Sequence, residues 1–312
     1  MISVTVERAR FDRRTGVFNV KVMSIAEPRP RVFSNYVRTA MLMAALIVLL
    51  GLVGRAVGGV NGMAAFLGFG VVMNFVMYWF SDRIALAAHR AQPVTAAEAP
   101  TLYAIVERLT RRAGLPMPRV YVIPSAAANA FATGRNPAHA AVAVTDGIMQ
   151  ILNERELEAV LGHELSHVKN RDVLIATIAA GVVGIISGIG HLAIWFGGGS
   201  RDGDRGGGIA GLAWLIIAPI LALLIQLAIS RSREFGADAS GAALVGDPEA
   251  LASALARLEQ GQQRQPYEFA GPATAHLFIV NPLRGRSASI MNLLSTHPPI
   301  EERIRRLQEM RT

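Results

Sequence analysis

The sequence has no cysteine and few charged residues. Of its 312 residues, 31 are Lys or Arg and 23 are Asp or Glu, 17% together, whereas 52% are hydrophobic. The lack of cysteine excludes disulfides, thiolate metal sites and thiol nucleophiles, so a metal site would have to use His, Asp or Glu. The formal net charge is +8, but no basic stretch is interleaved with aromatic residues. Nucleic acid is therefore not an expected partner.

Long segments without charge indicate an integral membrane protein. No Asp, Glu, Lys or Arg occurs in residues 39–54, 56–81, 173–200 and 206–230. A hydrocarbon core of about 30 Å needs about 20 apolar residues of helix. We therefore predict four transmembrane helices, at residues 39–54, 63–80, 173–196 and 209–229. A turn at Asn61-Gly62 would join the first two, and a Gly-rich connector the last two.

The distribution of Lys and Arg predicts the topology. Basic residues gather before the first predicted span, after the second, before the third and after the fourth. The positive-inside rule then puts both termini and both long polar segments in the cytoplasm. The predicted organisation is an N-terminal extension, a membrane hairpin, a cytoplasmic part, a second hairpin and a second cytoplasmic part, at residues 1–34, 35–80, 81–172, 173–229 and 230–312. The extension contains a predicted β-hairpin within residues 4–20, with Asp12 to Gly16 as its turn.

The segment at residues 153–168 carries the chemistry. Asn153 is a natural N-cap, and Glu156 three residues later completes a capping box. In the resulting helix, His163 and His167 project from one face, and Glu164 lies beside the first histidine. His-Glu-x-x-His supplies two zinc ligands and a carboxylate that takes a proton from water. The alternative, two accidental histidines on a solvated helix, fits poorly with the cap and the apolar neighbours.

A third ligand is required. Glu234 and Asp238 follow the fourth predicted span and lie one helical turn apart, so one of them could bind zinc while the other holds a ligand histidine. Spacing alone does not choose between them.

Several ordered motifs resemble the HtpX family of membrane-bound zinc metalloproteases, relatives of the prenyl-protein endopeptidases. These motifs are YWFSD, NAFATGRNP, HELSHVKNRD, SRSREF and STHPP, which begin at residues 78, 129, 163, 230 and 295. The resemblance runs from about residue 33 to residue 307. Residues 1–31 lie outside it, and we expect them to be dispensable or the product of a misplaced start.

The resemblance implies an HExxH-plus-Glu zinc endopeptidase with one Zn²⁺ per chain. Glu234 becomes the third ligand beside His163 and His167, Glu164 the catalytic carboxylate, and Asp238 the partner of a ligand histidine. The segment Asn129, Ala130, Phe131, Ala132 and Thr133, between predicted strands at 120–123 and 141–144, looks like the edge strand that binds substrate in similar proteases. His297 either donates to the oxyanion or only caps its turn.

Other polar residues have simpler expected roles. We expect His89 and His139 at the surface and no ligand role for His276. His191, inside the third predicted span, has either a function or a neutral packing role. The helix at residues 300–307 presents a solvated charged face, from which Arg303 could support the site.

The expected fold is mainly α: a polytopic membrane protein with four transmembrane helices and an α-rich, zincin-like cytoplasmic domain containing a small β-sheet. The resemblance implies quality control of damaged membrane proteins in a bacterial inner membrane. Its partners would be membrane-protein substrates and the lipid bilayer, with a homo-oligomer as a further option. Two alternatives remain, site-specific processing of one defined substrate and a non-proteolytic membrane scaffold. A transporter is disfavoured because no charged residue lies within the predicted spans.

Overall fold

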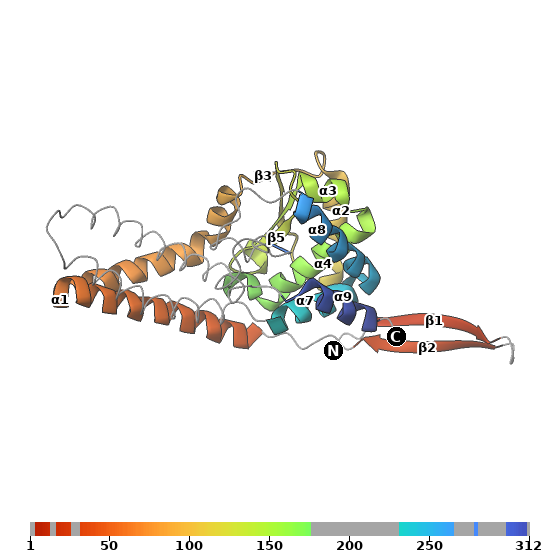
Figure 1. The fold of residues 1–312 in the computed structure, drawn as a ribbon, viewed down its shortest axis with the longest axis horizontal. Coiled ribbons are helices and arrows are strands. Elements are labelled where there is room, and N and C mark those ends of the chain that lie inside the picture. The colour runs from red at the N-terminus through yellow and green to blue at the C-terminus, as the bar shows by residue number, and fades with distance from the viewer. Residues whose placement is uncertain are drawn as a thin grey trace.

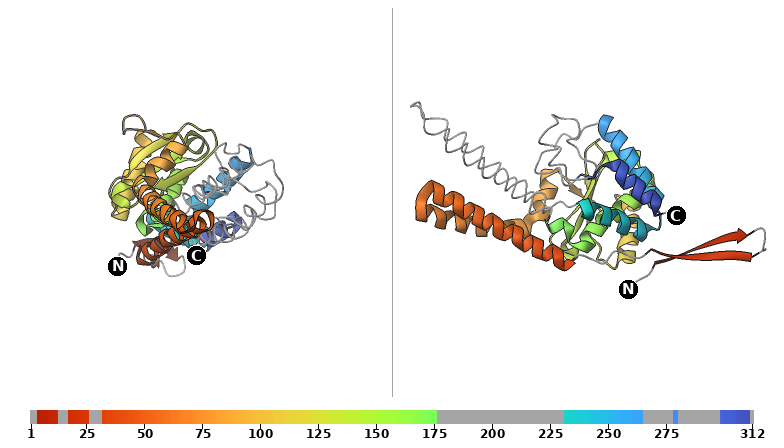
Figure 2. Two further views of the ribbon diagram at one scale, coloured as in Figure 1. Left: turned by 90° about the vertical axis from the view of Figure 1, so that its left-hand side faces the viewer. Right: turned by 60° about the horizontal axis from the view of Figure 1, so that its bottom comes forward.

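The N-terminal residues form a two-stranded hairpin. The computed structural model describes residues 4–12, 17–25, 32–175, 231–264, 278–279 and 298–310. Strands β1 (Val4–Asp12) and β2 (Val17–Ile25) pair antiparallel along their whole length. This pairing confirms the predicted hairpin and extends it to residue 25. The hairpin and helix α1 project from the molecule in opposite directions (Figures 1 and 2).

Helix α1 (Val32–Ala88) is bent back on itself and contains the first two predicted spans. Its two arms, Val32–Arg55 and Gly58–Ala88, are each long and apolar enough to cross a membrane. The predicted spans at 173–196 and 209–229 lie outside the described residues, apart from residues 173–175.

The turn between the two arms was predicted three residues too late. It falls at Gly58 and Gly59 rather than at Asn61-Gly62, because Gly59 adopts a φ of 62°, which favours glycine. Gly62 instead lets the arms approach closely, since a Cβ there would lie 2.3 Å from the carbonyl oxygen of Gly54.

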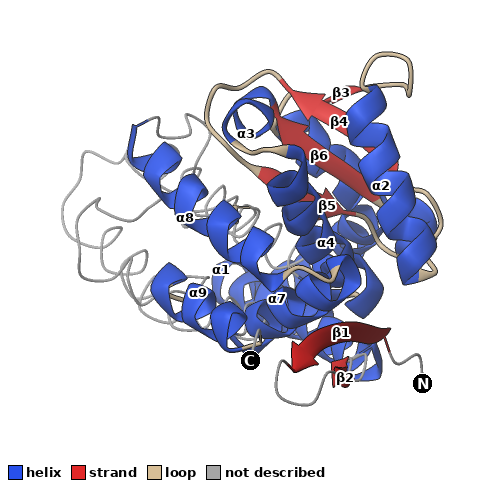
Figure 3. Ribbon diagram, turned by 90° about the vertical axis from the view of Figure 1, so that its right-hand side faces the viewer, coloured by secondary structure: helices blue, strands red, loops and turns tan. Residues whose placement is uncertain are grey.

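A four-stranded mixed sheet stands beside the end of α1. It consists, in spatial order, of β3 (Gln92–Pro93), β4 (Arg119–Ile123), β6 (Ala141–Thr145) and β5 (Ala130–Thr133) (Figure 3). Strands β4 and β6 are parallel, whereas the other two pairs are antiparallel. The predicted strands at 120–123 and 141–144 are confirmed, and the segment between them ends the sheet.

Both faces of this sheet are covered. Val142 and Val144 of β6 belong to the main core. That core also takes residues from α2 (Pro100–Ala113), α3 (Asp146–Ile151), α4 (Glu154–Asn170) and α8 (Pro248–Arg264). Ala141 and Ala143 point the other way and pack with Ala85 and Leu86 of α1. The second arm of α1 is thus packed directly on the sheet.

Helix α4 forms for the reason predicted. The Asn153 side chain accepts from the Glu156 N–H, and the Glu156 carboxylate accepts from the Asn153 N–H, which completes the capping box. Helix α7 (Arg231–Val245) packs on α4, and α9 (Ile300–Glu309) packs on α8 and α7 (Figure 1). The described structure is therefore mainly helical with a small mixed sheet.

Candidate metal centre

Three potential metal ligands converge between α4 and α7. His163 and His167 lie one turn apart on α4, and Glu234 lies in the first turn of α7. Their ligand atoms all lie within 4.8 Å of one another. The two Nε2 atoms are 3.2 Å apart, and the Glu234 carboxylate oxygens lie 3.7 Å from His163 Nε2 and 3.5 Å from His167 Nε2. One small site is thus built from two helices whose nearest ligands, His167 and Glu234, lie 67 residues apart in sequence.

Each histidine has its own carboxylate at the opposite ring nitrogen. His163 Nδ1 lies 2.9 Å from Asp238 Oδ1, and His167 Nδ1 lies 3.1 Å from Asp172 Oδ2. A carboxylate at Nδ1 favours the tautomer with its proton there, which leaves the lone pair on Nε2. Both Nε2 lone pairs then point into the cluster. Sequence spacing did not show whether Glu234 or Asp238 is the third ligand. In the structure Glu234 faces the Nε2 atoms, and Asp238 faces Nδ1 of His163.

Asp238 is itself fixed by a buried arginine. Arg303 of α9 is fully buried and donates from Nε and Nη2 to the two oxygens of Asp238, over 2.8 and 2.7 Å. Its Nη1 donates to the Ile279 carbonyl over 3.0 Å. Burial acts to raise the pKa of Asp238, but the Arg303 charge and hydrogen bonds outweigh it and lower that pKa to about 2. Asp238 therefore stays ionised.

Asp172 is held by a residue of α1. Arg171 ends α4 in the left-handed conformation, with φ 63°, and the chain turns so that Asp172 comes back to His167. Asn35 donates from Nδ2 to Asp172 Oδ1 over 2.6 Å and to the Asn170 carbonyl over 2.8 Å. The first turn of the first candidate span thus supports a ligand histidine.

Two glycines permit the close approach of α4 and α7. A Cβ on Gly241 would lie 2.6 Å from the His163 backbone nitrogen, and a Cβ on Gly162 would lie 2.9 Å from Val245 Cγ2. Any larger residue at either position would push the helices apart. No local sequence pattern indicates a role for these glycines or for Asp172 and Asn35, because their contacts are made between elements far apart in sequence.

The cluster favours positive charge. Burial acts to lower the pKa of His167, but the hydrogen bond to Asp172 and the charges of Glu234, Asp172 and Glu164 outweigh it and raise that pKa to about 9. Two imidazole nitrogens and one carboxylate are ordinary zinc ligands, and three protein ligands leave one coordination position open. The residues present therefore fit a catalytic zinc ion.

Glu164 lies between the metal cluster and the edge of the sheet. Its Oε2 accepts from the backbone N–H of Ala132 over 3.0 Å. Strand β5 is the last in the order of the described sheet, so the segment predicted to bind substrate is an edge strand next to Glu164. The side chains of Asn129 to Thr133 are buried, and the Asn129 amide oxygen accepts from Ile279 N–H over 3.3 Å. Strand β5 and Glu164 are thus coupled through the backbone of Ala132.

The other histidines differ in their placement. His297, His276 and His191 lie outside the described residues. His139 is exposed, as predicted. The surface prediction for His89 was wrong, because its ring is buried against Phe131 and Phe278, and its Nδ1 lies 2.9 Å from the Ala85 carbonyl oxygen. Burial lowers the pKa of His89.

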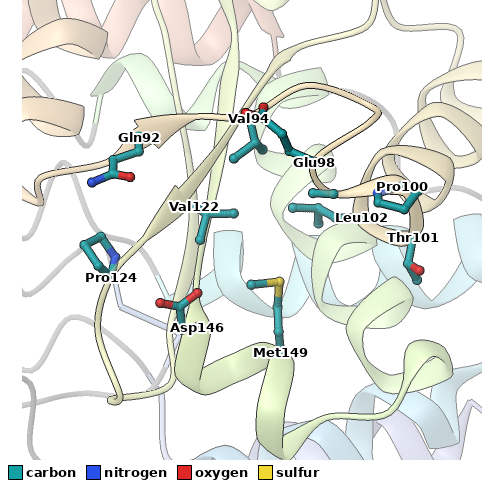
Figure 4. A pocket seen from close by; sticks show the side chains of 11 residues that line it. Gln92, Val94, Glu98, Pro100, Thr101, Leu102, Val122, Pro124, Asp146 and Met149 are labelled. Atoms are coloured by element: carbon teal, nitrogen blue, oxygen red, sulfur yellow. The ribbon is translucent and has the colours of Figure 1, made fainter.

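A separate cavity of about 440 Å³ lies between β3, β4, α2 and α3 (Figure 4). It contains two acidic side chains, Glu98 and Asp146. Glu98 accepts from the backbone N–H and the hydroxyl of Thr95, over 2.7 and 2.9 Å, so it caps a turn. None of the residues that line this cavity belongs to the metal cluster.

The fold and the site define a metallopeptidase, because an HExxH helix is combined with a third acidic residue on a second helix. The family described as Peptidase family M48 matches residues 96–311, and the chain belongs to that family. Proteins named "Protease HtpX homolog" from Syntrophobacter fumaroxidans, Thermococcus kodakarensis and Ralstonia pickettii are 56%, 54% and 51% identical to it. Each match covers 88% of this chain, and 98%, 96% and 96% of the respective relative. The resemblance to the HtpX family is thereby confirmed.

One solved structure is also similar. The crystal structure of S. mikatae Ste24p aligns with a TM-score of 0.47 and 20% sequence identity. The alignment covers 88% of this chain and 64% of that chain, less than two thirds of its length.

Proposed function

We propose that the chain is a zinc-dependent endopeptidase in which His163, His167 and Glu234 hold the metal. One observation carries the proposal: the two Nε2 atoms lie 3.2 Å apart beside the Glu234 carboxylate, while Asp238 and Asp172 occupy the opposite ring nitrogens. Such an arrangement orients the lone pairs of both histidines toward one point before any metal binds.

Glu164 is the proposed general base. Bound zinc would polarise the substrate carbonyl and make an attacking water more acidic. Glu164 would accept the proton of that water and deliver it to the leaving amine nitrogen. The hydrogen bond from Ala132 N–H supports this role, because it fixes the carboxylate beside the strand where substrate would lie. His297 remains the proposed donor to the oxyanion.

The substrate is proposed to add to β5 as an extra strand. Backbone hydrogen bonds would then give affinity for any extended segment, with little demand on its sequence. Such binding suits unfolded or damaged chains. We therefore propose quality control of membrane proteins in a bacterial inner membrane, with the site and both termini in the cytoplasm. The two candidate spans of α1 and the membership of the HtpX group support this proposal.

Purified full-length protein in detergent provides the test. We expect it to degrade an unfolded substrate such as casein, to stop when a chelator removes the metal, and to resume with zinc. Glu164→Gln should keep zinc and lose cleavage, whereas Glu234→Ala should lose zinc. Glu107→Gln, an exposed position on α2, is the matched control.

Three results would contradict the proposal. Unchanged cleavage in Glu164→Gln would show that Glu164 is not the general base. Full zinc occupancy in Glu234→Ala would show that the third ligand is a different residue. Absence of any chelator-sensitive cleavage of casein or of membrane-tethered substrates would favour the non-proteolytic scaffold.

A further inference from the structure

A large pocket lies where the second arm of α1 meets the sheet. Its volume is about 780 Å³, and it is separate from the metal cluster. One wall comes from α1 and contains the aromatic residues Phe75, Trp79 and Phe80. The other wall comes from the start of β4 and from the segment after β5, with Arg119 and Arg135.

The polar part of this pocket is strongly basic. Three arginines line it, Arg83, Arg119 and Arg135, against one carboxylate, Asp82. Arg119 forms an ion pair with Asp82, so its charge is compensated. Within the described part of the chain, Arg83 and Arg135 have no carboxylate partner. Two uncompensated cations therefore face one cavity.

Aromatic rings hold both cations in place. The Arg135 guanidinium lies 4.4 Å from the centre of the Trp79 ring, and the Arg83 guanidinium lies 5.7 Å from the centre of the Phe80 ring. Cation–π contacts of this kind orient a guanidinium and leave its N–H groups free to donate. The planar fork of N–H donors on a guanidinium matches the geometry of a phosphate better than the point charge of a lysine ammonium does.

For an arm that spans a membrane, helix length places the pocket at the depth of lipid headgroups. The 20 residues of helix from Gly59 to Trp79 rise about 30 Å, which equals the thickness of a hydrocarbon core. Trp79 then falls at the membrane interface, where Tyr and Trp gather. Phe75, one turn closer to the membrane centre, is 59% exposed. Headgroup and acyl chain would thus find suitable surfaces in one place.

We propose that this pocket binds an anionic phospholipid, with its phosphate on Arg83 and Arg135 and an acyl chain along Phe75. Charge complementarity and depth favour a lipid over an acidic peptide, because a peptide would not use the apolar surface of Phe75. The proposal does not depend on proteolysis. It assigns the aromatic end of the span a binding role in addition to its interfacial position.

The test is lipid binding to the full-length protein in a neutral detergent, followed by native mass spectrometry with phosphatidylglycerol or phosphatidylcholine. We expect the protein to prefer phosphatidylglycerol. Arg83→Gln with Arg135→Gln should weaken that binding roughly 25-fold, about fivefold for each charge removed. The control is Arg155→Gln with Arg305→Gln, which removes the same charge from exposed positions on α4 and α9 and should change nothing.

Zinc content and melting temperature show whether each variant is folded, and Arg83→Gln alone serves if the double variant is not. Equal affinity for the two lipids would overturn the proposal, and so would equal loss in the test and control variants. Displacement of the lipid by millimolar inorganic phosphate would assign the pocket to a soluble phosphate instead. An acidic peptide that binds more tightly than phosphatidylglycerol would assign it to peptide.

Discussion

Asn35 Nδ2 donates to Asp172 Oδ1 over 2.6 Å and so connects the first turn of α1 to the carboxylate that holds His167. Both residues are buried, and they lie 137 positions apart in sequence. A hydrogen bond of this kind fixes the orientation of a ligand histidine through its partner. The membrane hairpin is thereby part of the metal centre.

The first prediction concerns this contact. Asn35→Ala should lower zinc affinity roughly tenfold, because Asp172 loses a donor and holds His167 less firmly. Titration of metal-free protein with zinc measures the effect. Asn74→Ala is the control, since it removes a comparable hydrogen bond, from Asn74 to the Met43 carbonyl, inside the same hairpin. Equal zinc affinities for the two variants would show that Asn35 acts only on stability.

The second prediction concerns the contact of α4 with α7. Gly241→Ala places a Cβ 2.6 Å from the His163 backbone nitrogen, so it should destabilise the fold by about 1–3 kcal/mol and weaken zinc binding. Gly236→Ala on the same helix meets nothing within 4 Å and should be neutral or stabilising by up to about 1 kcal/mol. Thermal unfolding with and without zinc compares the two. A tolerated Gly241→Ala would disprove the need for close packing.

The third prediction separates stability from metal binding at the Arg303–Asp238 pair. Arg303→Met should cost about 3–5 kcal/mol of stability, because it leaves the Asp238 charge buried without its main partner. Adding Asp238→Leu should restore part of that stability, since the Asp238 charge is then removed, although Glu234 still loses the Arg303 charge 3.9 Å away. Zinc affinity should stay roughly 10- to 100-fold low, because His163 Nδ1 has lost the carboxylate 2.9 Å away. Zinc affinity that recovers together with stability would argue against a positioning role for Asp238.

The fourth prediction concerns pH. The buried His89 has a lowered pKa in the folded protein, so below about pH 6.5 the unfolded chain binds a proton that the folded protein resists. Its contribution to stability is complete above that pH and is lost as the pH falls, by at most about 1.4 kcal/mol per unit. His89→Leu should therefore flatten the pH dependence of the melting temperature between pH 7 and 5. A melting temperature of His89→Leu that still falls as steeply with pH as that of the unchanged protein would contradict this prediction.

Local patterns predicted the elements that depend on neighbours in sequence. The helix that carries His163 follows from the Asn153–Glu156 capping box, and β4 and β6 follow from short apolar runs. The contacts that sequence spacing does not contain were missed. Asn35 reaches Asp172 only through the packing of α1, and Gly162 and Gly241 matter only where two helices touch.

The burial of His89 likewise depends on contacts that the sequence pattern does not contain. A lone histidine after an apolar span is usually solvated, and nothing adjacent in sequence indicates otherwise. Its burial comes from Phe131 on β5 and from Phe278, which tertiary structure brings to it.

The packing of α1 has a practical consequence for dissecting this protein. Asn35 near the start of α1 and Ala85 with Leu86 near its end are both embedded in the part that holds the metal cluster. The two arms of α1 are therefore an integral part of this fold and not only a membrane anchor. A soluble fragment beginning after residue 90 would strip one face of the sheet, expose apolar Ala141 and Ala143 to water, and leave Asp172 short of a donor. Such a fragment should aggregate and bind zinc poorly, so work on the isolated catalytic part would describe a damaged enzyme rather than a simplified one.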